Sequence, residues 1–201
     1  MKKKILIISL MLSSTFCFSQ EIKALFSSND SSKTLSFGSY GGPLIETTHI
    51  NSDWGLAIGG KGGVIINQKF AFGGIGKRLV SRNNFLGNNL NGNESTSLSL
   101  SYGSGGVFGE YIFNMVSPLH FSIPINLMAG GVSIEENNVD IESSTIFIFE
   151  PGINLEFNFS KYFISAISVS YRQVFGGSLK NLNNRDLSGL NIGLVFKFGN
   201  F

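Results

Sequence analysis

Charged residues are scarce in this sequence. Only 14% of its 201 residues are Asp, Glu, Lys or Arg, whereas soluble proteins carry about a quarter. Twenty-five glycines and nineteen phenylalanines are present instead. With 42% apolar residues the chain can bury the core of one domain. We therefore expect something other than water to cover part of its surface.

Cysteine and long apolar runs are almost absent as well. The single cysteine, Cys17, follows three lysines and an apolar run at 5–12. This pattern is typical of a secretory signal peptide over 1–19 with cleavage before Gln20. The run is too short to span a bilayer as a helix, which needs about 20 residues. Cleavage removes the cysteine, which excludes a disulfide framework and a thiol site.

Removal of the signal peptide also changes the charge balance. The chain has fifteen basic and thirteen acidic residues, and loss of Lys2, Lys3 and Lys4 leaves twelve basic ones. A nearly neutral chain without a basic, aromatic-rich stripe has no electrostatic basis for nucleic-acid binding. We therefore expect no nucleic-acid partner.

Alternation of apolar and polar residues dominates the chain from residue 34 onward. The stretch 20–33 is polar and rich in serine, and we interpret it as a flexible lead-in segment. The region 34–201 contains eight period-2 segments, each long enough to cross a bilayer as a tilted strand. The predicted strands are 35–50, 54–66, 70–82, 95–113, 119–134, 145–159, 162–175 and 189–201.

One of these segments changes its alternation halfway. In 95–113 the apolar parity shifts from Leu100 and Tyr102 to Val107 and Tyr111, and three glycines lie at the shift. An extra residue inserted into one strand would move the following side chains to the opposite face. The pattern therefore predicts a β-bulge near the middle of this strand.

The connections between the segments differ in length in a regular way. After the first pair of strands, short turns alternate with longer polar loops, as in outer-membrane barrels with periplasmic turns and extracellular loops. The short connections are 51–53, 67–69, 114–118 and 160–161, and the long ones are 83–94, 135–144 and 176–188. Only the short 51–53 turn departs from this alternation, because it would face outside.

Aromatic residues are expected to gather at membrane interfaces. With the predicted strands, many of them fall near the periplasmic ends. These are Phe70, Phe72, Tyr111, Phe113, Phe121, Phe157, Phe159, Phe163, Phe196 and Phe198. Phenylalanines that simply filled a core would have no reason to prefer one end of the strands.

Alternation alone does not say which face points inward. A soluble lipocalin-like barrel has the same pattern with the opposite orientation, and its outer face carries many charges. Here the polar parity is mainly Gly, Ser and Asn with scattered charges, which suits the narrow interior of an eight-stranded barrel. We therefore favour an apolar face toward lipid and keep the soluble barrel as an alternative.

A few charged residues fall on the predicted inner face: Glu46, Lys61, Glu110, Glu150, Glu156, Arg172 and Lys197. We expect two levels, one with Glu110, Glu156 and Lys197 near the periplasmic end, and one with the other four above it. Buried charges need partners, so mutual ion pairing is the favoured interpretation. The alternative is a polar path for a small solute or protons.

The last strand resembles the C-terminal insertion signal of outer-membrane barrels. Asn191, Gly193, Phe196 and Phe198 supply its polar, glycine and two aromatic positions, although three residues follow where the signal usually ends. Residues 34–201 thus resemble the small eight-stranded outer-membrane barrels of the OmpX, OmpA transmembrane-domain and OmpW type. The resemblance implies an all-β, antiparallel, up-and-down transmembrane β-barrel without an open aqueous channel. It also implies insertion by the outer-membrane assembly machinery.

No motif of an enzyme, metal centre or cofactor site accompanies this architecture. His49 with Ser52 and Asp53 shares only residue types with the sites of lipid A-modifying barrels. We therefore expect no enzyme and no cofactor, and favour a structural or surface-interaction barrel that acts through its extracellular loops. A transporter or binder of a small hydrophobic ligand is the main alternative.

Outer-membrane lipid is the expected partner. Arg78, Arg82 and Arg185 fall near the outer ends of strands or in loops, where they could contact the phosphates of surface glycolipid. Lys77 and Arg78 are adjacent, so one of the two must point outward. Solvated loop-end charge is the simpler interpretation of all three arginines. The sequence gives no oligomeric state.

Overall fold

A computed structural model describes residues 35–51, 53–81, 83–88, 95–136, 139–177 and 183–201, with only the backbone given for 83–88, 95–98, 135–136 and 139–141. The predicted signal peptide and the 20–33 segment lie outside the described residues. Among the described residues, no helix is both long and apolar enough to cross a membrane.

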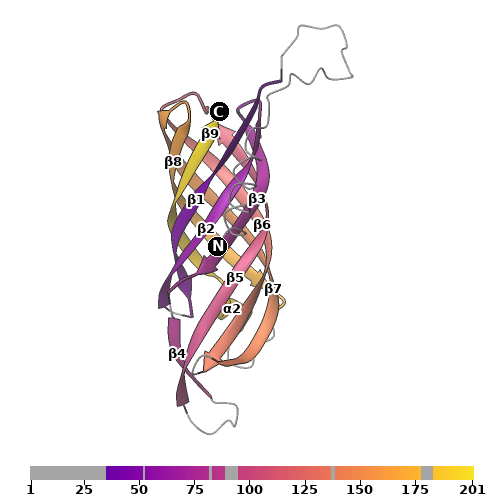
Figure 1. Ribbon diagram of the computed structural model, residues 1–201, viewed down its shortest axis with the longest axis vertical. Coiled ribbons are helices and arrows are strands. Elements are labelled where there is room, and N and C mark those ends of the chain that lie inside the picture. Colours follow the sequence, from indigo (N-terminus) through magenta and orange to yellow (C-terminus); the bar gives the residue numbers. More distant parts are fainter. Residues whose placement is uncertain (1–34, 52, 82, 89–94, 137–138, 178–182) are drawn as a thin grey trace, which may run out of the picture. The chain divides into compact units, whose positions relative to one another are not determined.

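Eight antiparallel strands form a closed ring, which confirms the predicted fold class. Each strand pairs with its neighbours in sequence, and β1 pairs with β9 to close the barrel (Figure 1). The ring consists of β1 (Phe37–Ile50), β2 (Asp53–Ile66), β3 (Phe70–Leu79), β5 (Ser95–Phe113), β6 (Leu119–Glu136), β7 (Val139–Ser160), β8 (Phe163–Phe175) and β9 (Gly189–Asn200). Closure removes the free edges that an open sheet would expose.

Asparagine supports the tight turns between these strands. Asn67 and Gln68 both have positive φ, of 54° and 56°, the backbone of a type I′ turn between β2 and β3. Asn51 and Asn114 have φ near 50° in two other turns. Asn tolerates this left-handed conformation better than most residues, so the predicted turns form where the sequence supplies it.

Side chains alternate between the outside and the inside of the barrel as the sequence pattern predicts. In β7, Phe147 and Ile153 are 60% and 59% exposed, whereas Glu150 and Asn154 are 1% exposed. The outer face is therefore apolar and the charges face inward. A soluble barrel would place these two sets the other way round.

The bulge predicted in 95–113 is absent, and this prediction is wrong. β5 pairs with β3 and with β6 without a register shift, and Leu100 and Tyr102 are buried on the inner face. The apparent change of parity has a different cause. Outward positions 103 and 105 are glycines, so the apolar residues that stand out in the first half of the strand are the inward ones.

Two of the predicted long loops contain further strand. β3 ends at Leu79 instead of 82, and β4 (Asn83–Asn88) then pairs with the start of β5. The strands β6 and β7 likewise continue to Glu136 and from Val139. In β4 the two apolar residues are adjacent and do not alternate. At the start of β7, Val139 and Ile141 alternate with Asp140 and Glu142, but this short signal lies in a stretch that the acidic residues made look like a loop. The 176–188 loop contains one helical turn, α2 (Asn184–Leu187).

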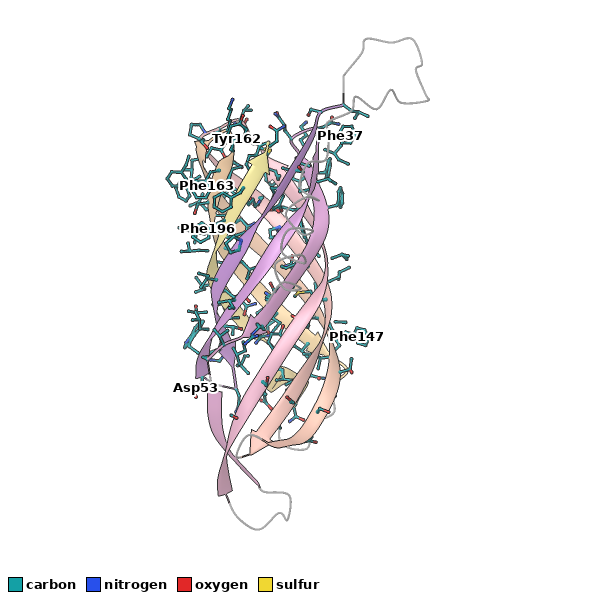
Figure 2. The ribbon with its side chains drawn as sticks, in the orientation of Figure 1. Phe37, Asp53, Phe147, Tyr162, Phe163 and Phe196 are labelled. Atoms are coloured by element: carbon teal, nitrogen blue, oxygen red, sulfur yellow. The ribbon has the colours of Figure 1, made fainter. Side chains whose placement is uncertain are left out.

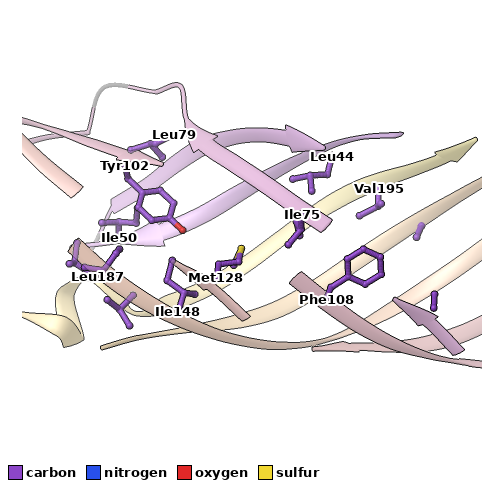
Figure 3. Packing of buried hydrophobic residues seen from close by; sticks show 14 of the residues in the cluster. Leu44, Ile50, Ile75, Leu79, Tyr102, Phe108, Met128, Ile148, Leu187 and Val195 are labelled. Atoms are coloured by element: carbon purple, nitrogen blue, oxygen red, sulfur yellow. The ribbon is translucent and has the colours of Figure 1, made fainter. Parts of the chain in front are cut away.

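The barrel interior is less polar than the predicted mixture of Gly, Ser and Asn. Apolar side chains fill the space between the buried charges, among them Leu44, Ile75, Phe108, Met128 and Ile148 (Figure 3). Apolar contact of this kind supplies packing that small polar residues cannot. The interior is therefore a packed core with charged layers, which sets the geometry of the site described next.

Candidate functional site

The first charged layer lies in the part of the barrel nearer the short turns and is centred on Glu110. We call Lys61, Glu110, Glu156 and Lys197 the Glu110 cluster. Lys61 Nζ lies 2.9 Å from Glu110 Oε2, and Lys197 Nζ lies 2.9 Å from Glu110 Oε1 and 2.7 Å from Glu156 Oε1. Two cations thus pair with two anions, and all four side chains are buried.

Neutral side chains supply the remaining hydrogen bonds of this cluster. Ser122 Oγ lies 2.5 Å from both Glu110 Oε1 and Glu156 Oε1. Asn154 Nδ2 and Tyr40 Oη donate to Glu110 over 2.9 and 3.1 Å. Because a buried carboxylate is stable only when its oxygens are hydrogen-bonded, these partners are part of the structure of the cluster.

His120 closes the Glu110 cluster toward the short turns. Its Nδ1 lies 3.2 Å from the carbonyl oxygen of Ser117, and its Nε2 lies 3.2 Å from Glu156 Oε2. The ring thus lies between a backbone carbonyl oxygen and a carboxylate oxygen. The ring is buried and held between β6 and β7.

The second charged layer surrounds Lys77. We call Glu46, Lys77 and Glu150 the Lys77 cluster. Lys77 Nζ lies 2.8 Å from Glu46 Oε1 and 2.8 Å from each carboxylate oxygen of Glu150. Asn126 and Asn191 also donate to Glu150, both over 3.1 Å, and Ser170 Oγ donates to it over the same distance. Strands on all sides of the barrel are thereby joined across its interior.

Arg172 lies nearest the long hairpins and pairs with no carboxylate among the described residues. It donates to the backbone carbonyls of Leu187 and His49 over 2.8 and 2.9 Å, and to Thr48 Oγ1. Its guanidinium also lies 5.5 Å from the ring centroid of Tyr102. These contacts fasten α2 to the end of β1. The guanidinium suits this role because its donors fan out in one plane.

The charges inside the described barrel balance. Four glutamates (Glu46, Glu110, Glu150, Glu156) face three lysines (Lys61, Lys77, Lys197) and Arg172. Desolvation of charges is costly, and ion pairing together with hydrogen bonds from neighbouring side chains offsets the cost. In the described part of the chain, no group of three or more His, Cys, Asp or Glu residues could hold a metal ion. The arrangement can bind strands together and fill the lumen.

The partners differ from the predicted ones. All seven predicted residues face the interior. Lys61, however, pairs with Glu110 and not with Glu46 or Glu150. Arg172, which was predicted at the same level, pairs with neither of these two glutamates. The cation of that level is Lys77, which the sequence reasoning did not assign. Its strand could have been oriented from Ala71, Ile75 and Leu79, which share its parity and are all buried. Gly73 and Gly74 obscured that signal.

The four residues of the predicted insertion signal each make specific contacts in the folded barrel. Asn191 joins Thr48 to Glu150 inside. A Cβ at Gly193 would lie 2.5 Å from the carbonyl oxygen of Ile45, so this position requires glycine where β9 meets β1. Phe196 and Phe198 face outward and stack on Phe163. Gly199 and Asn200 continue the closing strand, and Phe201 after them stacks on Tyr40.

Aromatic side chains form two outer clusters at the end with the short turns. Figure 2 shows Phe163 and Phe196 toward that end and Asp53 toward the other. Phe70 contacts Phe72 and Tyr111, with ring centroids 6.5 and 5.1 Å apart. Phe163 contacts Phe159 and Phe198, with centroids 5.5 and 4.8 Å apart. The aromatic residues thus form part of a band around one rim.

The remaining predicted residues lie on the outside or beyond the described residues. Arg78 and Arg185 are exposed, and Arg82 lies outside the described residues. His49 stacks edge-on against Trp54, with ring centroids 5.3 Å apart. Ser52, its suggested neighbour in a lipid-modifying site, is outside the described residues. None of the described contacts gives the His49 ring a partner for acid–base catalysis.

Comparisons with known proteins support the architecture. No protein-family model matches the sequence, and no curated protein matches it significantly. Neisserial surface protein A (NspA) has a similar structure, with a TM-score of 0.60 and 14% identity over 82% of this chain and 97% of that one. Ail, the attachment invasion locus protein of Yersinia pestis, gives a TM-score of 0.46 and 14% identity, over 81% and 97% of the two chains. The Ail score is too low to support a conclusion. At this identity NspA supports the fold alone, and the chain has the fold of the small eight-stranded outer-membrane β-barrels.

Proposed function

We propose that this protein is an integral outer-membrane barrel that conducts no solute, catalyses no reaction and acts at the cell surface through its long hairpins. The observation that carries the proposal is the filled interior. The Glu110 and Lys77 clusters lie at two levels of the lumen, with buried apolar side chains between and around them. A solute would have to displace paired charges to pass, and breaking such pairs is costly.

The hairpins extend well beyond the ring on one end. The pairing of β7 with β8 ends at Phe147 and Phe175. The earlier part of β7, from Val139, extends beyond this point and pairs with β6. On the other side β4 extends the sheet along β5. Figure 1 shows these strands projecting beyond the rest of the barrel. Strands that project into solvent offer backbone and side-chain surface to a partner.

Outer-membrane lipid surrounds the barrel in this proposal, and the barrel assembly machinery inserts it through the closing strand. The apolar outer face and the aromatic band support contact with acyl chains. A lumen that carries a small hydrophobic ligand has less support, because buried side chains such as Phe108 and Met128 occupy the space between the charged layers.

Conductance measurements test the closed lumen. The processed protein is refolded, its insertion into a planar bilayer is verified, and current is recorded in molar potassium chloride. We expect no stable channel. Long-lived, uniform current steps from the inserted barrel would contradict the proposal, and the same preparation unfolded by boiling serves as the control.

Shortening one hairpin tests the surface role. A variant in which a two-residue Asn-Gly turn replaces 83–98 keeps the ring-forming part of β5 while removing β4. Cells that display either form at equal levels are tested for adhesion to a panel of immobilised matrix proteins and glycans. We expect adhesion of the full-length form and loss in the shortened one. Equal adhesion of both forms, or none by the full-length form, would contradict a role for this hairpin.

A further inference from the structure

Arg78 is a cation on the outer, lipid-facing side of the barrel. It lies on β3, where it pairs in register with Ile58 of β2 and Gly103 of β5, and its side chain is exposed. No described residue forms an ion pair or hydrogen bond with it. Its sequence neighbour Lys77 points inward and is saturated by two glutamates. Arg78 is therefore a charge without a partner in the protein as described.

The depth of Arg78 follows from strand geometry. Phe70 lies in the aromatic band at the other end of the same strand. Eight residues at about 3.4 Å each, tilted by about 40°, raise Arg78 about 21 Å above Phe70. The apolar band of an outer-membrane barrel is about 25 Å tall. The Cα atom of Arg78 thus lies just below the outer interface, within reach of lipid headgroups for a long side chain.

A surface hollow adjoins this cation. It has a volume of about 570 Å³ and is lined by Pro43, Ile45, Ile58, Gly76 and Arg78, together with three residues at inward-facing positions: Leu44, Gly59 and Lys77. We call it the Arg78 groove. It is an open depression of the outer surface that could cover one side of an acyl chain. Apart from Arg78, the outward side chains that line it are apolar, so its lining suits a hydrocarbon chain.

A second hollow continues the groove around the barrel. It has a volume of about 530 Å³, includes Gly105 and Val107 of β5, and reaches the outward Phe147 and Phe149 of β7. Gly76 of the first hollow pairs directly with Gly105 of the second. Neighbouring residues of β3 and β5 thus line the two hollows, two residues along β3 from Arg78.

The barrel itself does not require the glycine that opens the groove. A Cβ at Gly76 would approach nothing closer than the carbonyl oxygen of Ser104 at 3.7 Å, which is an ordinary contact. At the inward-facing Gly59, by contrast, a Cβ would lie 2.8 Å from the Cβ of Lys77 and closer still to the backbone of Gly76. Glycine at 59 is therefore required for the close contact of β2 with β3, whereas Gly76 can be replaced without a clash inside the barrel.

We propose that Arg78 and the groove beside it bind a phosphorylated lipid of the outer leaflet. The guanidinium donates hydrogen bonds to a phosphate oxygen at the headgroup level, and acyl chains of the same lipid lie in the two hollows. Charge complementarity favours this occupant, because a phosphate at the headgroup level can pair with the arginine and a purely apolar partner cannot. The inference rests on the proposed insertion into the outer membrane.

Native mass spectrometry of the detergent-solubilised barrel tests the site with diphosphorylated lipid A as the probe. We expect one retained lipid and an apparent affinity lowered about tenfold in Arg78→Gln, the loss of one charge-assisted contact. Gly76→Leu, which fills the groove, should weaken retention similarly. Dephosphorylated lipid A should bind no better to the original protein than to Arg78→Gln.

Two matched controls make the result specific. Lys161→Gln removes a cation from the turn at the other end of the barrel, and Ser165→Leu enlarges an outward residue of β8. Neither should change lipid retention. Equal retention by the original protein, Arg78→Gln and Gly76→Leu would overturn the inference, as would an absence of any retained lipid. A dimer that forms without lipid and is lost in Gly76→Leu would instead assign the groove to a second copy.

The outcomes separate this inference from the proposed function. Every variant is first checked for heat-modifiable gel migration and for insertion into liposomes. Failure of the original protein to insert would overturn the proposed function and, with it, the lipid site. Normal insertion without phosphate-dependent lipid retention would overturn the lipid site alone.

Discussion

Lys77 and Arg78 show how one step along a strand decides the role of a charge. The two cations are adjacent on β3, yet Lys77 is buried between Glu46 and Glu150 while Arg78 faces outward. Their side chains differ little in charge or length. Because successive residues of a strand point to opposite faces, position alone separates a structural ion pair from a surface contact.

Substitution of each cation by methionine should therefore have very different effects. Lys77→Met leaves two buried carboxylates without their cation, and we expect a loss of about 3–5 kcal/mol in the free energy of unfolding. Arg78→Met should change it by less than about 1 kcal/mol, since charge near the interface costs little. Denaturant titration in neutral-lipid vesicles measures both. Similar losses in the two variants would contradict the assigned orientations.

Arg172 supports a second prediction at this scale. Its bonds to the carbonyls of Leu187 and His49 hold α2 against β1. Arg172→Leu should lower stability by about 2–3 kcal/mol, the usual contribution of hydrogen bonds to a charged group. Hydrogen exchange should also become faster in α2 while the middle of β8 remains protected. Unchanged exchange in α2 would show that other contacts hold it.

The sequence predicted which charges face the lumen more reliably than which of them pair. Alternation assigns a face to each residue, and Glu110, Glu156 and Lys197 were placed together by strand position alone. The pairing of Lys61 with Glu110 depends on side-chain reach across a narrow lumen, which no strand pattern encodes. Lys77 was missed because two glycines interrupt the alternation of its strand.

At the scale of elements, the seam between β1 and β9 depends on close backbone contact. A Cβ on the inward-facing Gly42 would collide with the carbonyl oxygen of Phe196, whereas one on the neighbouring Gly41 would have nothing within 4 Å. Gly193 meets the same seam from the opposite strand. Small residues thus allow the last strand to join the first.

Alanine at these two adjacent glycines should distinguish the two situations. Gly42→Ala should destabilise the barrel by about 1–3 kcal/mol, because the added methyl group forces the strands apart. Gly41→Ala should be neutral or stabilising by up to about 1 kcal/mol, since it restricts only the unfolded chain. Refolding yield and denaturant midpoints in lipid vesicles compare the two. A stable Gly42→Ala barrel beside a destabilised Gly41→Ala barrel would reverse the assignment.

Strands with an apolar outward face were predictable, and their extensions were not. The segment 145–159 alternates clearly because apolar residues such as Phe147 and Ile153 occupy its outer face, while Glu150, Asn154 and Glu156 face inward. In β4 no such alternation is present, and in the earlier part of β7 it is limited to Val139 and Ile141 beside acidic residues. The glycines at 103 and 105 were misinterpreted as a bulge. They lack a side chain at outward positions, which hides the alternation, but the strand register does not change there.

At the scale of the whole molecule, the barrel reverses the usual arrangement of a soluble protein. Apolar residues such as Phe147 and Ile153 cover its outside, while eight charges balance one another within. Closure through β1 and β9 gives every strand a partner on both sides within the ring, as a bilayer demands of the part that spans it. The apolar exterior and the packed, charged interior thus both follow from the same orientation of the strands.

Spin labelling along β7 tests this orientation most directly, because removal of the predicted signal peptide leaves no native cysteine to interfere. Labels are placed one at a time at Phe147, Ile148, Phe149, Ile153 and Asn154 of the barrel in lipid vesicles. We expect labels at 147, 149 and 153 to be accessible to oxygen and shielded from a water-soluble nickel complex, and labels at 148 and 154 to be shielded from both. Accessibility of 147, 149 and 153 to the nickel complex, or of 148 and 154 to oxygen, would contradict the account.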